Sequence, residues 1–96
     1  MKDSSDKKRK AALIEGMVRR RQWKMSYKTI EDTVSKLPGR EKKQTLEIID
    51  ELVSEGWAEY HKNGECVSLR SSKRKEIRDF LEQYSEMESW MLDTLF

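Results

Sequence analysis

The chain of 96 residues contains one cysteine, one proline and one histidine. A single cysteine excludes a disulfide within the chain and is typical of a reducing compartment. Because the sequence has no Cys/His cluster, we expect no metal site and no cofactor. No apolar run approaches the roughly 20 residues that cross a bilayer, and none follows the charged N-terminus as in a secretory signal. We therefore expect one small cytoplasmic domain with no membrane partner.

Charged residues make up 40% of the chain but balance to a net charge of +2. Residues 1–25 hold nine basic and three acidic side chains, whereas residues 26–70 and 71–96 each carry a balance of −2. This asymmetry indicates an anionic partner for the N-terminal part, although basic tails also serve solubility alone. The first ten residues contain no large apolar side chain after Met1, so we predict a flexible basic arm over 1–10.

Apolar spacing predicts three helices in the next part of the chain. The first begins at Ala11 and ends in the basic residues Arg19, Arg20, Arg21 and Lys24. The second opens with Ser26 as its N-cap. A stripe on the second helix, which Pro38-Gly39 ends, comprises Tyr27, Ile30, Val34 and Leu37. The third helix extends from about Arg40 to Glu55, with Gly56 as its C-cap. Its apolar stripe comprises Leu46, Ile49 and Val53.

A β-hairpin is the strongest local prediction. Asn63-Gly64 is the preferred pair for a two-residue type I′ turn, and it joins residues 57–62 to residues 65–70. The resulting register places Ala58 opposite Leu69, Tyr60 opposite Val67, and His61 opposite Cys66. One face then collects the apolar side chains of Ala58, Tyr60, Val67 and Leu69, and we expect that face to pack against the helices.

Residues 71–96 are predicted to form one long helix that Ser71 or Ser72 caps. Its a/d-like seam and its apolar end exceed what a small core covers, so we predict a dimerisation element. The expected dimer interface comprises Ile77, Phe80, Tyr84, Met87, Trp90, Met91 and Leu95. The alternative is that this helix folds back over its own domain.

The order of helix, helix, turn, helix and hairpin over residues 11–70 resembles the winged helix-turn-helix family. The resemblance depends on Ser26, on Pro38-Gly39, and on residues 45–57, which end in Leu-x-x-x-Gly-Trp directly before the hairpin. It is similar to small archaeal and bacterial transcriptional regulators. The resemblance implies a mainly α fold with a small β-hairpin, to which the long C-terminal helix is added.

The same resemblance implies a recognition helix at about 40–55 in the DNA major groove and a wing at 57–70 on the backbone or the minor groove. Arginine can pair with guanine and glutamine with adenine, while lysine neutralises phosphate. The candidate DNA-binding residues are Arg40, Lys42, Lys43, Gln44, Lys28, Lys62, Asn63, Arg9 and Lys10. Glutamate and aspartate on the recognition helix, however, make it nearly neutral overall.

The sequence therefore favours a dimeric, sequence-specific regulator of transcription that binds double-stranded DNA and is associated with the nucleoid. The alternative is a winged-helix protein-interaction module that uses the apolar C-terminal helix. No phosphate loop or acidic metal constellation supports an enzyme or a small-molecule ligand. His61 and Cys66, which face each other in the predicted hairpin, lack a third residue and a pocket for nucleophilic catalysis.

Overall fold

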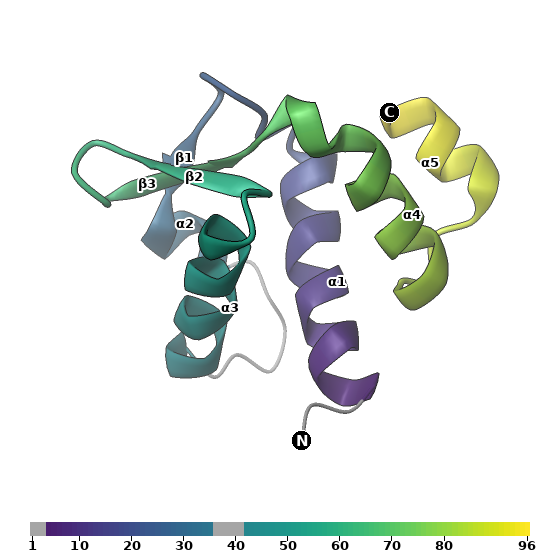
Figure 1. The fold of residues 1–96 in the computed structure, drawn as a ribbon, viewed down its shortest axis with the longest axis horizontal. Helices are drawn as coiled ribbons and strands as arrows, with labels where there is room; N and C mark the ends of the chain where they lie inside the picture. Colours follow the sequence, from purple (N-terminus) through teal and green to yellow (C-terminus); the bar gives the residue numbers. More distant parts are fainter. Residues whose placement is uncertain (1–3, 36–41) are drawn as a thin grey trace.

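A computed structural model describes residues 4–35 and 42–96 of the chain. The structure is mainly helical with a small antiparallel sheet (Figure 1). In chain order the elements are α1 (Ser4–Arg19), β1 (Lys28–Thr29), α2 (Ile30–Ser35), α3 (Lys42–Ser54), β2 (Ala58–His61), β3 (Cys66–Leu69), the 3-10 helix η1 (Ser71–Lys73), α4 (Arg74–Tyr84) and α5 (Ser89–Leu95). The strand order is β1-β3-β2. Among the described helices, none is long and apolar enough to span a membrane.

The first helix starts earlier than the predicted arm allows. Instead of a flexible segment over residues 1–10, α1 begins at Ser4 and continues without a break. The arm prediction is wrong over residues 4–10 because Lys10 is held by tertiary contacts. Its Nζ atom lies 2.5 Å from Glu55 Oε1 and 5.5 Å from the centre of the Trp57 ring. Charged residues thus extend a helix whose Leu13 and Met17 are buried in the core.

At its C-terminal end α1 closes with a left-handed turn at Arg21, whose φ is 54°. The amide of Gln22 donates to Met17 O at 2.9 Å, and the amide of Arg21 donates to Val18 O at 2.9 Å. These two bonds form a Schellman motif, in which glycine is the preferred residue at the left-handed position. Arginine at this position therefore strains the backbone.

We expect the free energy of unfolding of Arg21→Gly to be about 0.5–1 kcal/mol higher than that of Arg21→Ala, because glycine adopts a positive φ without a Cβ clash. Both variants remove the same charge, so their difference isolates the backbone term. Urea unfolding followed by circular dichroism measures it. Equal stabilities of the two variants would contradict a left-handed residue at this position.

The segment predicted as the start of the second helix is partly a strand. Lys28 and Thr29 form β1, where Lys28 pairs with Val67 of β3, and α2 begins only at Ile30. The amide of Asp32 donates to Thr29 Oγ1 at 3.0 Å, so Thr29 rather than Ser26 is the N-cap. The prediction is wrong here because pairing with a distant strand overrides local helical spacing. The predicted turn at Pro38-Gly39 lies outside the described residues.

The hairpin register is confirmed. Ala58 pairs with Leu69, Tyr60 with Val67, and His61 with Cys66. The turn contains three positive φ values, 54° at Lys62, 58° at Asn63 and 88° at Gly64, so the left-handed backbone begins one residue before the predicted two-residue turn, and the Glu65 amide donates to Lys62 O at 3.2 Å. The predicted two faces are only partly confirmed. All four residues of the central strand β3 are buried, whereas the side chain of Tyr60 is exposed.

Helix α3 ends as its sequence predicts. The φ of Gly56 is 80°, and the amide of Trp57 donates to Leu52 O at 2.9 Å across the Schellman turn. This turn directs the chain immediately into β2. Ile49 and Leu52 are buried against the core, but Leu46 of the predicted stripe is exposed. The predicted start of the helix at Arg40 lies outside the described residues.

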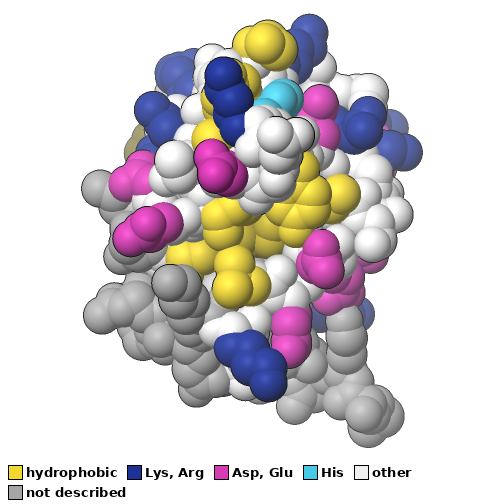
Figure 2. Space-filling view, turned by 90° about the vertical axis from the view of Figure 1, so that its left-hand side faces the viewer, with side chains coloured by type: hydrophobic (Ala, Val, Ile, Leu, Met, Phe, Trp, Pro, Cys, Tyr) yellow, Lys and Arg dark blue, Asp and Glu magenta, His cyan; other side chains and the backbone are white. Residues whose placement is uncertain are grey.

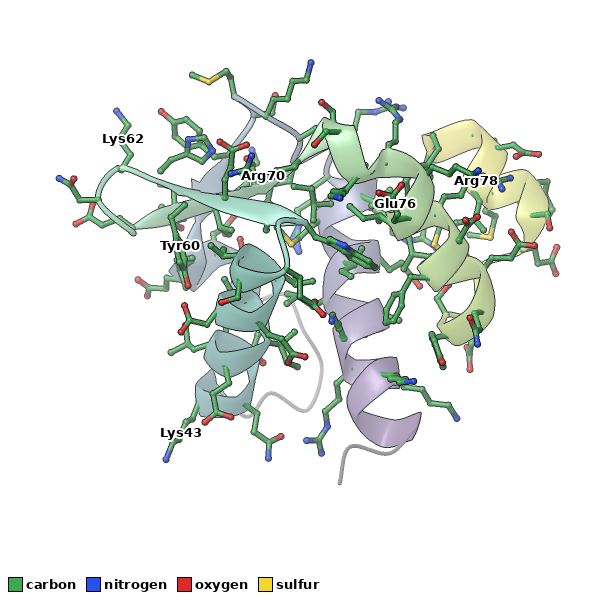
Figure 3. All side chains as sticks on the ribbon, viewed as in Figure 1. Lys43, Tyr60, Lys62, Arg70, Glu76 and Arg78 are labelled. Carbon is green, nitrogen blue, oxygen red and sulfur yellow. The ribbon has the colours of Figure 1, made fainter. Side chains whose placement is uncertain are left out.

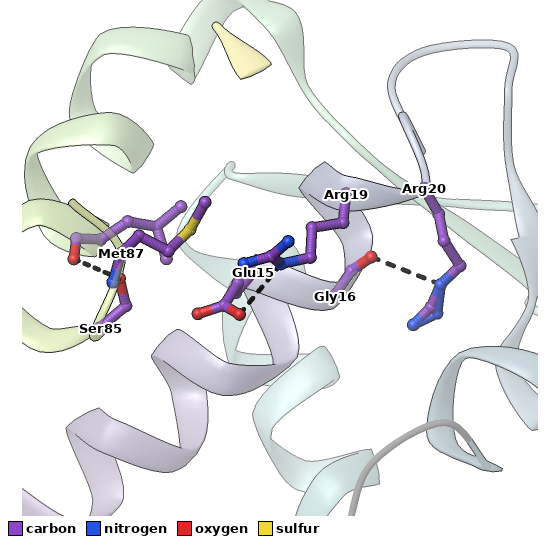
Figure 4. Close-up of polar contacts among 7 residues, drawn as sticks. Glu15, Gly16, Arg19, Arg20, Ser85 and Met87 are labelled. Carbon is purple, nitrogen blue, oxygen red and sulfur yellow. Dashed lines mark hydrogen bonds and ion pairs between the residues drawn. The ribbon is translucent and has the colours of Figure 1, made fainter. Parts of the chain in front are cut away.

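The C-terminal segment forms two helices instead of one. Helix α4 ends at Tyr84, the chain reverses over residues 85–88, and α5 lies beside α4 (Figure 1). Ser85 stabilises the reversal, because its Oγ donates to Leu81 O at 2.7 Å and accepts from the Met87 amide at 3.2 Å (Figure 4). The C-terminal segment therefore folds back over its own domain, which was the alternative to a single long helix.

Most residues of the predicted dimer interface are covered, fully or in part, by the chain's own core. Ile77 and Met87 are buried within the chain's own core. Four more are half-buried against that core: Phe80, Tyr84, Met91 and Leu95. Trp90 is the one exposed residue of the predicted set, with 65% of its surface accessible. The apolar spacing of this segment correctly predicted a buried face, but that face packs largely on α1 of the same chain.

Candidate nucleic-acid interface

The predicted DNA-binding residues fall into two groups in the structure. Lys43 lies near the start of α3, at the lower left of the molecule, whereas Lys62 lies at the hairpin tip, at the upper left (Figure 3). Lys28 and Asn63 belong with Lys62, because β1 and the hairpin form one sheet. Arg40 lies outside the described residues, as does the side chain of Lys42.

The first group joins two segments that are far apart in the sequence. Helices α1 and α3 both begin at the lower end of the molecule (Figure 1). There an Nη1–H of Arg9 donates to Oε1 of Gln44. A groove of about 480 Å³ lies between the two helices, and its lining combines Gln44 with three basic side chains and three glutamates: Lys7, Arg9, Lys10, Glu47, Glu51 and Glu55. We call the exposed side chains of Lys7, Arg9, Lys43 and Gln44 the basic end.

Positive charge at this end of the molecule comes from two helix ends and from side chains. Each described helix that starts here has the positive end of its dipole at this end of the molecule. Arg9 and Lys43 add full positive charges, and neither lies within 4.0 Å of a carboxylate of the described residues. Gln44 offers an amide group that can donate and accept hydrogen bonds.

Lys10 is not available for DNA, which corrects its predicted role. The side chain is only 13% exposed and lies 2.5 Å from Glu55 and 3.7 Å from Glu51. Its ammonium group also lies 5.7 Å from the centre of the Phe80 ring. These contacts join α1 to α3 and α4, so Lys10 has a structural role.

The second group comprises exposed side chains around the sheet. Lys62 and Asn63 both adopt left-handed backbone angles, and both are exposed at the tip of the hairpin. Lys28 is exposed on the edge strand β1. In the space-filling view, Lys and Arg side chains gather in the upper part of the molecule around His61 (Figure 2). This group forms a second, separate basic region.

Between the two groups, the exposed side of α3 is apolar and acidic. Leu46 and Tyr60 are 39% and 38% exposed, and the Tyr60 hydroxyl donates to Asp50 Oδ1 at 2.8 Å. Burial, this hydrogen bond and the charge of Asp50 raise the pKa of Tyr60 from 10.0 to about 12. The phenol therefore stays protonated and retains its hydrogen bond. A side chain predicted to be core instead belongs to the surface.

Two arrangements near the sheet were not apparent from the sequence. The rings of Tyr27 and His61 stack with centroids 4.4 Å apart, and His61 Nε2 lies 2.9 Å from Ser68 Oγ. Gln22 is fully buried and donates through Nε2 to Thr33 Oγ1 and to Val67 O. No periodicity marks a polar side chain for burial, so spacing could not have identified Gln22.

In the part of the chain that the structure describes, no three His, Cys, Asp or Glu side chains are grouped so as to hold a metal ion. The protein belongs to the class of mainly helical folds with a small three-stranded antiparallel sheet. No protein-family model matches the chain, and no curated protein or solved structure is significantly similar to it.

Proposed function

We propose that this chain is a winged helix-turn-helix domain that binds double-stranded DNA. Several features support the winged arrangement: the order of α1, α2 and α3, the hairpin that follows α3 directly, and the pairing of β1 with β3. In this arrangement α3 is the recognition helix and residues 57–70 form the wing. The proposal extends to a sequence-specific regulator of transcription.

The observation that carries the proposal is the contact between Arg9 and Gln44. Each residue is a candidate on independent grounds, one in a basic N-terminal segment and the other on the predicted recognition helix. Their contact gathers charge and hydrogen-bonding capacity at the end of α3 that a helix-turn-helix domain inserts into the major groove. Lys43, the residue before Gln44, adds an exposed cation at the same end of α3.

The residues of the basic end have distinct roles in this proposal. Lys43 neutralises a phosphate, and Arg9 holds Gln44 in position for a base edge such as that of adenine. Lys62 and Asn63 contact the backbone from the wing. Asp50 and Glu47, further along α3, repel phosphate and confine the contact to the first turn of the helix. We therefore expect modest non-specific affinity.

The proposal is tested by fluorescence anisotropy with a labelled 20-base-pair duplex of mixed sequence, at salt concentrations from 50 to 200 mM. We expect affinity to fall with salt, because binding releases counterions from the phosphates. Arg9→Ala/Lys43→Ala should weaken binding by about tenfold or more and reduce the salt dependence by about one counterion, because Lys43 is the phosphate contact of the pair.

Arg19→Ala/Lys75→Ala is the matched control, since it also removes one arginine and one lysine, both exposed and distant from the basic end. Its affinity should stay within about twofold of the unmodified protein. Binding that does not depend on salt would refute the proposal, as would an equal loss in the control variant. Selection from a random duplex pool then tests sequence specificity, which requires an enriched motif.

A further inference from the structure

A second groove lies between α3, the hairpin and the start of α2. Its volume is about 620 Å³. Its lining residues are Thr29, Ile30, Glu31, Leu46, Asp50, Tyr60, Gly64 and Glu65. Figure 2 shows this side of the molecule, where a continuous apolar patch is surrounded by acidic side chains. None of these lining residues belongs to the basic end.

The floor of the groove is unusually apolar for such a polar chain. Four large hydrophobic side chains are exposed among the described residues, and two of them, Leu46 and Tyr60, line this groove. Ile30 is half-buried beside them. In a chain that is 40% charged, adjacent exposed apolar side chains indicate a contact surface.

The groove is also held in shape by hydrogen bonds across it. The Ile30 amide donates to Glu65 O at 2.9 Å, which joins the start of α2 to the hairpin turn. On the other side, the Tyr60 hydroxyl donates to Asp50 at 2.8 Å and joins the hairpin to α3. A partner would therefore meet a preformed surface and would lose less free energy to ordering it.

The charge of the rim determines what can bind. Three carboxylates, those of Glu31, Asp50 and Glu65, line the groove, and no lysine or arginine is among its lining residues. Phosphate is repelled by this arrangement, so DNA is disfavoured here. A second copy of the chain is also a poor fit at its exposed Trp90, because the indole of Trp90 donates to the Glu88 carboxylate, which has the same charge as the rim.

We propose that this groove binds a basic amphipathic segment of a protein partner. Apolar side chains of the segment pack on Leu46 and Tyr60, while its flanking lysines or arginines pair with Glu31 and Glu65. This mode resembles the insertion of one apolar helix face into a groove. The groove shares no lining residue with the basic end, so variants can test peptide binding and DNA binding separately.

The test uses two synthetic helical peptides of 14 residues with the same leucine face and with either lysine or glutamate at the polar positions. Titration into the ¹⁵N-labelled protein is followed by NMR. We expect the lysine peptide to bind and to shift the amides of Ile30, Leu46, Tyr60 and Glu65. The glutamate peptide should bind at least about tenfold more weakly.

Two variants and a control locate the binding. Leu46→Ser removes an apolar contact, and Glu65→Lys reverses a charge on the rim of the groove. Each variant should therefore bind the lysine peptide about tenfold more weakly. Glu86→Lys makes the same charge reversal at the connection between α4 and α5 and should leave its affinity unchanged. A folded NMR spectrum of each variant excludes loss of structure as the cause.

Three results would overturn the proposal: equal binding of both peptides, an equal effect of Glu86→Lys, or amide shifts centred on Trp90. The peptide affinity of Arg9→Ala/Lys43→Ala must also match that of the unmodified protein. Because this measurement contains no DNA, failure of DNA binding and failure of peptide binding are distinguishable. Weakened DNA binding in Glu65→Lys, with no change in peptide binding, would assign the groove to DNA and refute the proposal.

Discussion

Leu92→Ala is expected to lower the free energy of unfolding by about 3 kcal/mol. Leu92 is fully buried although it belongs to α5, the last helix of the chain. Its side chain packs in the same core cluster as Ile77 and Leu81 of α4. Truncation to alanine removes buried apolar surface and leaves a cavity that the surrounding helices fill only in part. Urea unfolding followed by circular dichroism measures the loss.

Trp90→Ala is the matched control on the same helix. Trp90 is 65% exposed, so its removal should change the free energy of unfolding by less than about 0.5 kcal/mol. If both variants were nearly neutral, α5 would not be part of the folded core. A separate C-terminal helix, available to a second copy of the chain, would then be the better description.

We expect Gln22→Glu to be strongly destabilising at neutral pH. Gln22 is fully buried, and its Nε2 donates to Thr33 Oγ1 at 3.1 Å and to Val67 O at 2.9 Å. A glutamate here replaces the amide N–H donors with a carboxylate oxygen that faces acceptor atoms. Within the described residues, Oε1 of Gln22 already lacks a hydrogen-bond partner. Burial and the missing donors therefore raise the pKa of the introduced carboxyl in the folded state.

The sign of the pH dependence follows from this raised pKa. Below the unfolded-state pKa of about 4.3, the carboxyl is protonated in both states and adds no charge penalty. As pH rises above that value, the unfolded state ionises first, so stability falls until the folded-state pKa is reached. The penalty relative to the unmodified protein should grow by about 2–3 kcal/mol between pH 4 and pH 7. Urea unfolding at the two pH values measures it.

Gln83→Glu introduces the same chemistry on the exposed surface of α4 and should show no such pH dependence. Gln22→Leu removes the same hydrogen bonds without adding an ionisable group, so its loss should be constant with pH. An identical pH response of Gln22→Glu and Gln83→Glu would show that residue 22 is not buried in solution.

Elements that depend on local backbone conformation were predicted well. Asn63-Gly64 favours left-handed angles at two consecutive residues, and this alone determined the pairing of His61 with Cys66 and of Ala58 with Leu69. Gly56 ended α3 for the same reason, because it adopts a φ of 80° without strain. Their signals reside in neighbouring residues and do not require knowledge of the rest of the fold.

Elements that depend on distant contacts were predicted poorly. Strand β1 exists because Lys28 and Thr29 pair with β3, almost forty residues later in the chain. The helical arm is held by Lys10, whose charge indicated solvent but whose ammonium group lies among Glu55, Trp57 and Phe80. In each case a contact with a residue distant in the sequence outweighs the local conformational preference, and the spacing of apolar residues does not reveal that contact.

The candidate site shows the same division. Residue chemistry identified Arg9, Lys43 and Gln44, but only the packing of α1 beside α3 brought Arg9 into contact with Gln44. Helical and strand periodicity assigned Leu46 and Tyr60 to the core, although both are exposed in the acid-rimmed groove. Periodicity identifies an apolar face without showing how much of it another element covers.

By itself, the sequence determined the hairpin register and the end of α3 at Gly56. Tertiary structure alone decided that residues 4–10 are helical, that Thr29 caps α2, and that the C-terminal segment reverses to bury Leu92. The physical reason is range. Turn and cap geometries are set by a few adjacent dihedral angles, whereas burial is set by elements distant in the chain that compete for the same apolar surface.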